Sequence, residues 1–356
     1  MKRSAVLLFL LMLSYFAMGA EEVSEPVNIP DEYSGDVDAM AAYIKRNCKD
    51  TRQMLWTLQN WLSENVVYDF SALDAQSKFQ DEDLANWTLR NRKGVCANYA
   101  SLFSKVSNRM GIPMFVIRGY DSKNNFKRIS GAHAWCACII DSVPYMFDPT
   151  WSSGYVNEDA SEYYKRLDSK YFMAFPDSFK ERHIPYDPLM RLGAKVSSDQ
   201  TSGDTINLPT MNEMGWLDSL TAYFQLDPIE QKKAIYDRMI RNGDKNKYAV
   251  EYAAYVKSFI DNHTLEEQQD RCRRMIDQIS NLQNHLEELN FVSPGADRSM
   301  HRAIEEFRSE LDDALSQTET VTTPDLSKFL KDVRQNIQML NKRVDKCESM
   351  LKKKKR

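Results

Sequence analysis

The stretch KGVCANYA, residues 93–100, decides the fold and function of this chain more than its composition does. It places Cys96 just after a glycine, at the start of a predicted helix. Unpaired backbone N–H groups and the helix dipole at such a position favour a thiolate over a thiol. Cys96 is therefore a candidate nucleophile, with its own N–H available as an oxyanion donor. When this stretch is considered alone, the alternative is that Cys96 is a buried structural cysteine.

Two later stretches, GAHAW at 131–135 and FDPTW at 147–151, supply an imidazole and a carboxylate. We expect His133 to open a strand over 132–140 and Asp148 to end the returning strand over 145–148. In a hairpin these positions fall at the same end, so the Asp148 carboxylate would orient the His133 ring toward Cys96. The alternatives are that His133 is a core histidine and that Asp148 is a turn residue before a proline.

The surrounding pattern predicts an α+β domain. Apolar residues recur at helical spacing over 36–65, and a helix from Cys96 should stop at Gly111, which Pro113 follows. Apolar runs over 114–119 and 132–140 predict strands, with a turn at 141–144. Helices followed by antiparallel strands are typical of α+β domains rather than of alternating β-α units.

From residue 211 the pattern is almost entirely helical. Asp227 and Thr264 each begin a capping pattern at a predicted helix start. Three apolar seams follow, and the last has the strict four-three spacing of a coiled coil. The first seam comprises Cys272, Ile279, Leu282, Leu286 and Leu289, and the second comprises Met300, Ile304, Phe307 and Leu311. The third comprises Leu326, Leu330, Val333, Ile337, Leu340, Val344, Cys347 and Leu351. Two arrangements remain open, an antiparallel bundle within one chain and a coiled coil between chains.

The N-terminus has the pattern of a secretory signal peptide. Lys2 and Arg3 precede an apolar run over 5–18, which small residues and then two glutamates follow. We expect export, to the periplasm or the medium, although an uncleaved anchor is an alternative. The predicted segments are a signal peptide at 1–20, a linker at 21–35, an α+β domain at 36–195, a linker at 196–210 and a helical region at 211–356.

Composition excludes some function classes. With 42% hydrophobic and 28% charged residues, the 356-residue chain can bury a sizeable core. A formal net charge of -4 gives no reason to expect a nucleic-acid partner. Six cysteines leave the disulfide state open, and the chain needs no disulfide scaffold at this size. Cys136 and Cys138, two apart on a strand, are expected to be small buried residues.

Residues 36–192 resemble the transglutaminase-like domains of papain-like cysteine enzymes, especially the kyphoscoliosis-peptidase-type branch. The resemblance rests on KGVC at 93–96, AHAW at 132–135 and DPTW at 148–151, with VYD at 67–69 upstream. An aromatic pair, a proline and a His-x-Pro run between 171 and 185 also match that branch. The resemblance implies a papain-like core in which a nucleophile helix packs on an antiparallel sheet.

The same resemblance assigns roles. It implies that Cys96 is the nucleophile, His133 the general base and acid, and Asp148 the orienting carboxylate. Trp135 and Trp151 would wall the substrate site. No metal and no cofactor are implied.

The chain departs from the family pattern at two positions. Arg90 stands where papain-like proteases have an oxyanion-hole glutamine, so another donor is needed, for which Tyr68 is a candidate. Met190 stands where this branch often has tryptophan. His183 maps to a position that looks structural in the family.

These features predict an exported cysteine enzyme that attacks amide bonds, with hydrolysis favoured over transfer to an amine. Its substrate would be a protein or peptide, with cell-wall peptide as one option. The rival is a catalytically silent binding or scaffolding module that acts through the helical region, which would mediate self-association or protein contacts. Metal binding by Cys136, Cys138 and His133 is a third, weaker alternative.

Overall fold

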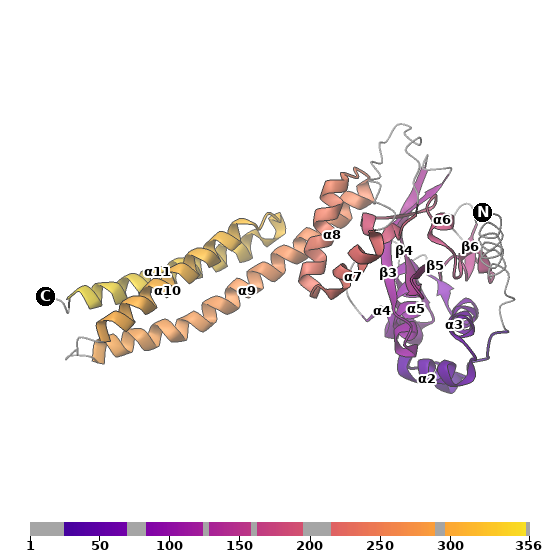
Figure 1. Ribbon diagram of the computed structural model, residues 1–356, viewed down its shortest axis with the longest axis horizontal. Helices are drawn as coiled ribbons and strands as arrows, with labels where there is room; N and C mark the ends of the chain where they lie inside the picture. Colours follow the sequence, from indigo (N-terminus) through magenta and orange to yellow (C-terminus); the bar gives the residue numbers. More distant parts are fainter. Residues whose placement is uncertain are drawn as a thin grey trace, which may run out of the picture. The chain divides into compact units, whose positions relative to one another are not determined.

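The computed structural model describes residues 25–69, 83–123, 128–157, 162–194, 215–288 and 296–353 (Figure 1). The expected signal peptide at 1–20 and the linker at 196–210 lie outside these residues. The chain divides into two compact units, Met1–Asp218 and Ser219–Arg356. None of the helices in the described ranges combines the length and apolar composition that a bilayer-spanning segment needs.

The lead-in expected as a linker over 21–35 packs against the first unit from its first described residues. The side-chain amide of Gln53 donates to the Glu25 carbonyl at 2.8 Å, and the Val27 N–H donates to Thr57 Oγ1 at 3.0 Å. Ile29 is buried in the core. These contacts explain why a proline- and acid-rich segment is held in place: its backbone groups bond to side chains of one helix.

The first unit begins with helices, as predicted. They are α2 (Val37–Asn47), α3 (Thr51–Asn65), α4 (Leu84–Asn91), α5 (Cys96–Met110) and α6 (Pro176–Phe179). Asp36 caps α2 by accepting from the Ala39 N–H at 2.9 Å, and Asp50 caps α3 by accepting from the Gln53 N–H at 2.8 Å. The helix predicted from Cys96 is confirmed, and it ends where Gly111 takes up a left-handed conformation (φ 89°).

Strands of the first unit form a four-stranded sheet and two small pairs. They are β1 (Val67–Tyr68), β2 (Lys93–Gly94), β3 (Met114–Lys123), β4 (Arg128–Ile140), β5 (Val143–Phe147), β6 (Gly154–Val156), β7 (Tyr163–Lys165) and β8 (His183–Pro185). The large sheet has the order β5-β4-β3-β8, with all pairs antiparallel. Helix α5 packs against β3 and β4 (Figure 1). The predicted α+β architecture, with the helix that begins at Cys96 packed on an antiparallel sheet, is confirmed.

Three details of the sheet differ from the sequence prediction. Strand β4 begins at Arg128 rather than at residue 132, so His133 lies inside the strand and does not open it. The turn is confined to Asp141 and Ser142, both at positive φ (50° and 64°), as a tight two-residue hairpin requires. Strand β5 therefore resumes at Val143, two residues early, and β8 was not predicted at all.

The second unit is helical, as predicted. Beyond α7 (Trp216–Gln225), which crosses the division, it contains α8 (Pro228–Asn242), α9 (Lys247–Glu288), α10 (Ala296–Glu319) and α11 (Ser327–Lys353). Asp227 caps α8 by accepting from the Glu230 N–H at 2.9 Å, as expected. The helix start predicted at Thr264 is wrong, because α9 runs through it. The Thr264 hydroxyl donates to the Ile260 carbonyl at 2.9 Å, which satisfies it inside the helix.

Helices α9, α10 and α11 run side by side within one chain (Figure 1), and seam residues of all three pack in one apolar cluster. The expected seam residues Leu282, Leu286 and Leu289 lie outside the side chains that the structure describes. Six seam residues of α11 are buried: Val333, Ile337, Leu340, Val344, Cys347 and Leu351. They meet Cys272 and Ile279 of α9 and Ile304 and Leu311 of α10 in one cluster. This packing is the one that the single-chain bundle predicts.

Candidate active site

Local packing fixes Cys96 at the first residue of α5. The Val95 N–H donates to Asn98 Oδ1 at 3.1 Å, and the Asn98 N–H donates to the Val95 carbonyl at 2.9 Å. Asn98 in turn donates to Thr88 Oγ1 of α4 at 3.1 Å. Gly94 makes this possible, since a Cβ there would lie 2.4 Å from Asn98 Cβ. The turn before the thiol is therefore held by a buried asparagine that only glycine can accommodate.

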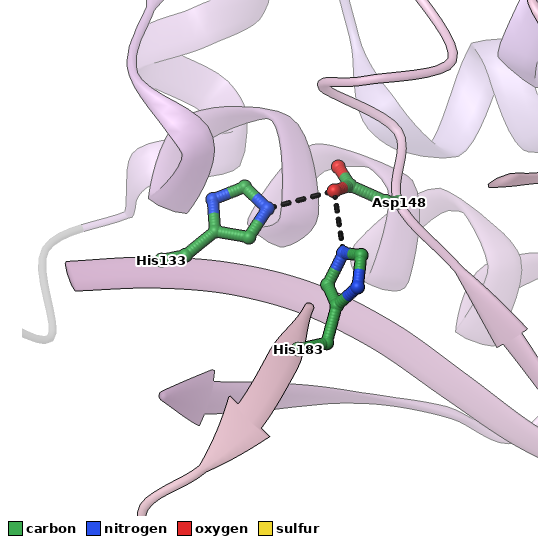
Figure 2. Close-up of side chains that lie close together, drawn as sticks. All are labelled: His133, Asp148 and His183. Carbon is green, nitrogen blue, oxygen red and sulfur yellow. Dashed lines mark hydrogen bonds and ion pairs between the residues drawn. The ribbon is translucent and has the colours of Figure 1, made fainter. Parts of the chain in front are cut away.

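The structure brings His133 and Asp148 together. His133 lies on β4 and Asp148 lies one residue after β5, and the register opposes Cys136 to Phe147 between them. The His133 Nε2 is 2.7 Å from Asp148 Oδ2, and both side chains are buried (Figure 2). The ring thus uses Nε2 for the carboxylate and leaves Nδ1 for the thiol of Cys96.

The Asp148 carboxylate receives four hydrogen bonds and has no solvent exposure. Its Oδ1 accepts from the backbone N–H groups of Thr150 and Trp151, each at 3.0 Å. Its Oδ2 accepts from His133 and, at 2.9 Å, from Nε2 of His183 (Figure 2). A carboxylate so fully hydrogen-bonded is held in the ionised form despite its burial.

Sequence analysis treated His183 as structural, whereas the structure places it in the same cluster. It opens β8, where it pairs with Asp121 of β3. The signal was present in the His-x-Pro run at 183–185, but a three-residue strand that pairs with residues about sixty positions earlier leaves no local pattern.

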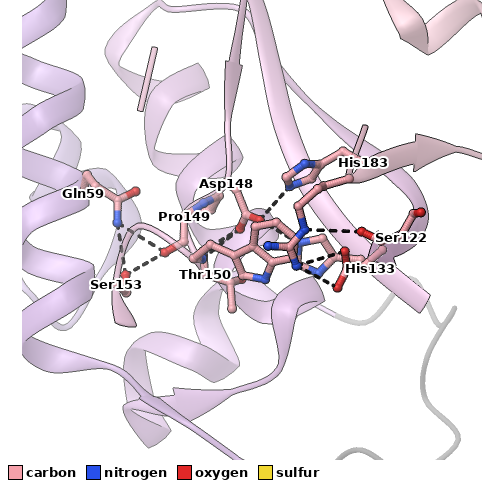
Figure 3. Close-up of polar contacts among 11 residues, drawn as sticks. Gln59, Ser122, His133, Asp148, Pro149, Thr150, Ser153 and His183 are labelled. Atoms are coloured by element: carbon pink, nitrogen blue, oxygen red, sulfur yellow. Dashed lines mark hydrogen bonds and ion pairs between the residues drawn. The ribbon is translucent and has the colours of Figure 1, made fainter. Parts of the chain in front are cut away.

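The loop after Asp148 is anchored to α3 by a second buried residue that sequence analysis missed. The Gln59 side-chain amide donates to the Pro149 carbonyl at 3.2 Å and to Ser153 Oγ at 3.0 Å (Figure 3). The Ser63 hydroxyl donates to the Ser153 carbonyl at 3.2 Å. These bonds satisfy buried polar groups of the loop and fix the backbone that carries both Asp148 and Trp151.

Electrostatics favours charge separation between Cys96 and His133. Burial opposes ionisation of Cys96, but a hydrogen bond to His133, the ring's positive charge and the Ala134 N–H together hold the pKa of the thiol below its usual value. Burial likewise opposes the charge of His133, yet Asp148 and then Cys96 outweigh it and raise the pKa of the imidazole to about 10. Burial also opposes ionisation of Asp148, but the positive charge of His133 and the hydrogen bonds from His133 and His183 hold the pKa of its carboxyl well below its usual range. The site therefore favours a thiolate–imidazolium pair.

His183 is electrostatically different from His133. Burial, the largest effect, lowers the pKa of His183, and the charge of His133 acts in the same direction. Asp148 only partly compensates. His183 is therefore neutral near pH 7, and its Nε2 carries the proton that bonds to Asp148.

His133, Asp148 and His183 are also the cluster, among the residues that the structure describes, whose donor atoms could hold a metal ion. These atoms lie within 4.8 Å of one another. Two imidazoles and a carboxylate suit zinc. However, the nitrogens are 2.7 and 2.9 Å from the same oxygen, and these separations are those of direct hydrogen bonds. We therefore interpret the cluster as a hydrogen-bonded chain.

The two tryptophans expected to wall the site have different surroundings. Trp151 is partly exposed and stacks on His133 at 4.9 Å between ring centroids, while the Arg182 guanidinium lies 4.2 Å from the Trp151 ring. Trp135 is fully buried, and its ring packs edge-on to His183 at 5.0 Å. Because Trp135 offers no surface to a substrate, we retain only Trp151 as a wall.

Tyr68 lies close to Cys96. Strand β1 pairs with β2 so that Tyr68 is opposite Gly94, two residues before Cys96. Burial and the negative charges of Cys96 and Asp148 raise the pKa of Tyr68 strongly, so its hydroxyl keeps its proton. Arg90, in the last turn of α4, is exposed. Tyr68 thus remains a candidate oxyanion donor.

The other cysteines have different properties. None of the six, each in a described range, forms a disulfide in the structure. Cys136 and Cys138 are buried, as expected, and Cys136 Sγ donates to the Ala100 carbonyl at 3.3 Å. Burial raises the pKa of both thiols, to about 12 for Cys138. Burial also raises the pKa of Cys48. Cys96 differs from these three in having a lowered pKa.

Comparisons with known proteins place part of the chain in a known superfamily. Residues 38–149 match the family model of the transglutaminase-like superfamily. The chain contains a transglutaminase-like domain. Kyphoscoliosis peptidases of Homo sapiens and Mus musculus are each 29% identical to it over 130 residues, or 35% of this chain and 19% of theirs. The resemblance inferred from the motifs is thus confirmed, over less than a fifth of the length of those relatives.

A solved structure is also similar in part. The periplasmic domain of TgpA from Pseudomonas aeruginosa, bound to ethylmercury, is 22% identical, with a TM-score of 0.27. The similarity covers 35% of this chain and 46% of that one.

Proposed function

We propose that the transglutaminase-like domain is an exported cysteine enzyme that cleaves amide bonds through an acyl-enzyme. The observation that carries this proposal is the continuous chain from the Cys96 thiol through the His133 ring to the buried Asp148 carboxylate. That order of groups matches what nucleophilic acyl transfer requires. Export rests on the signal-peptide pattern of residues 1–20.

In the proposed reaction the Cys96 thiolate attacks the carbonyl carbon of an amide, and the π electrons move to the oxygen. The backbone N–H of Cys96 is in the first turn of α5, where helix N–H groups have no intrahelical acceptor, so it is positioned to stabilise that oxyanion. The C–N bond then breaks as the His133 imidazolium protonates the leaving amine. A thioester and a neutral imidazole remain.

Deacylation reverses these roles. His133 takes a proton from the incoming nucleophile, which attacks the thioester and expels the Cys96 thiolate. Water as nucleophile makes the protein a peptidase or amidase, and a primary amine makes it a transglutaminase. We favour water, because the sequence has no calcium-loop pattern of the regulated animal transglutaminases. A protein or peptide is the proposed substrate.

The test is to incubate the full chain with a diverse peptide library, with and without a primary amine, and to analyse products by mass spectrometry. Cys96→Ala is expected to abolish both cleavage and amine incorporation. Cys48→Ala is the matched control, because Cys48 is also partly buried but burial raises its pKa. If wild type forms neither product, or if Cys96→Ala retains activity, the enzymatic proposal fails and a binding module becomes the better interpretation.

A further inference from the structure

We infer that His183 is a positioning residue: its neutral ring fixes the Asp148 carboxylate and thereby sets the ionisation of Cys96 and His133. This inference rests on the proposed function of the same site. His183 touches neither the thiol nor a reacting atom in this scheme. It acts through the one carboxylate oxygen that it shares with His133.

The shared oxygen gives His183 this influence. Oδ2 of Asp148 accepts from His133 at 2.7 Å and from His183 at 2.9 Å, so the two rings occupy both of its lone pairs (Figure 2). Without the second donor, Oδ2 would have an unfilled lone pair in a fully buried site, and the carboxylate would lose part of what keeps it ionised. A carboxylate that ionises less readily would orient the His133 ring less well and would stabilise its imidazolium form less.

The neutral state of the His183 ring suits this role. The charged and titratable groups around it are Asp148, His133, Asp121, the Tyr171 ring at 6.3 Å between centroids, and Arg182, which pairs with Asp121. A neutral donor bonds to Asp148 without competing with the His133 imidazolium for its negative charge. A second cation at this position would compete for the negative charge of Asp148. It would thereby weaken the ion pair that keeps His133 protonated.

Among the described residues, only one ring nitrogen of His183, Nε2, has a hydrogen-bond partner. The side chain is 1% exposed, and its Nδ1 is buried with no hydrogen-bond partner among the described residues. An unsatisfied buried nitrogen destabilises a fold, and an apolar residue of similar size would avoid it. Retention of the imidazole is consistent with a need for the Nε2–H donor.

The surroundings hold the ring in one orientation. The Phe179 ring centroid lies 4.2 Å from that of His183, and the Trp151 centroid lies 4.5 Å from it. The β8 backbone is held at the sheet edge by Gly119, where a Cβ would lie 2.1 Å from the Ile184 carbonyl oxygen. Next to it, Arg182 bonds to both carboxylate oxygens of Asp121, at 3.2 and 3.3 Å. His183 therefore has little freedom to turn away from Asp148.

The test compares two variants of the full chain, His183→Leu, which removes the donor at similar volume, and His183→Gln, whose amide keeps an N–H donor of similar reach. The rate of Cys96 alkylation by iodoacetamide is measured against pH, with the modified peptide identified by mass spectrometry. We expect His183→Leu to react about tenfold to a hundredfold more slowly at pH 7, the loss expected for one hydrogen bond to a charged group. His183→Gln should recover most of the rate.

A wild-type alkylation profile in folded His183→Leu would overturn the inference, because a merely structural residue would leave the ionisation of Cys96 unchanged. A second measurement needs no variant: nitrogen NMR of the native imidazoles should show His183 neutral and protonated at Nε2 while His133 is charged. A charged His183, or a proton on its Nδ1, would also overturn it. If the chain cleaves no amide but the variants shift alkylation as expected, the proposed function fails and the positioning role stands.

Discussion

Replacing Asp148 by asparagine preserves the shape of the side chain but removes its charge and exchanges one acceptor oxygen for a donor amide. The remaining oxygen can still accept from the Thr150 and Trp151 N–H groups, which lie at 3.0 Å. The new amide group then faces the ring nitrogens of His133 and His183. It cannot accept their protons, so His133 must give up its Nε2–H or turn away.

The size of the effect follows from the bond that is lost. The His133–Asp148 contact, at 2.7 Å with both groups buried, is a hydrogen bond to a charged group, which contributes about 1.5–3 kcal/mol. About 1.4 kcal/mol corresponds to a factor of ten, so the thiolate–imidazolium pair should be roughly tenfold to a hundredfold less populated. A neutral His133 with its proton on Nδ1 is also unable to act as base toward Cys96. We therefore expect kcat/KM to fall by at least the same factor.

Two measurements test this expectation, the pH dependence of Cys96 alkylation and the rate of peptide cleavage, with circular dichroism to establish that the variant is folded. Asp187→Asn is the matched control, because Asp187 is also buried but its carboxylate accepts from the Leu189 N–H at the start of a short helix. The control should alkylate and cleave like wild type. A folded Asp148→Asn protein with wild-type alkylation and cleavage would refute the role assigned to the carboxylate.

Four further expectations concern pH, the oxyanion, the sheet and the bundle. In Cys96→Ala, where no thiol can offset it, the stabilising contribution of the His133–Asp148 pair should be fully present below about pH 6.5 and should be lost as the pH rises through the pKa of His133, which Asp148 raises; chemical unfolding should show this fall, and the added His133→Gln change should remove it. Tyr68→Phe should lower kcat by up to about a hundredfold with little change in KM if its hydroxyl stabilises the oxyanion, whereas unchanged kinetics would exclude that role. Gly119→Ala should destabilise the first unit by at least about 1–3 kcal/mol, because the new Cβ would lie 2.1 Å from the Ile184 carbonyl oxygen; an unchanged melting temperature would contradict this packing. In the bundle, Leu340→Ala should lower the free energy of unfolding by about 2–5 kcal/mol, whereas Met339→Ala, at a residue 49% exposed, should have little effect; equal effects would contradict the observed core.

Local signals predicted much of the fold. Helix α5 could be placed from Cys96 to Gly111, because a glycine in the left-handed conformation ends a helix in a recognisable way. The hairpin that joins β4 and β5 was also found, since the strands it connects are adjacent in the sequence. The sequence alone therefore predicts that His133 and Asp148 pair.

Non-local and competing signals explain the errors. Strand β8 has three residues, and only its pairing with β3 defines it, so neither the strand nor His183 could be placed. Thr264 carries a capping pattern, but its hydroxyl bonds within α9 and the helix continues. Trp135 was expected at the substrate surface, yet it is fully buried on an interior strand of the sheet, where the rings of His133 and His183 pack against it. In each case tertiary contacts, which the sequence does not display, decided the outcome.

The position of His183 so late in the domain has a consequence for biosynthesis. The family match ends at residue 149, after Cys96, His133 and Asp148, yet the fourth member of the cluster arrives 35 residues beyond Asp148 on a separate strand. A nascent chain would therefore carry all three reacting groups well before the domain could arrange their charges. On the positioning role that we propose for His183, a fragment that stops at the border of the family match should lack the lowered thiol pKa, which would appear only once the chain extends through β8.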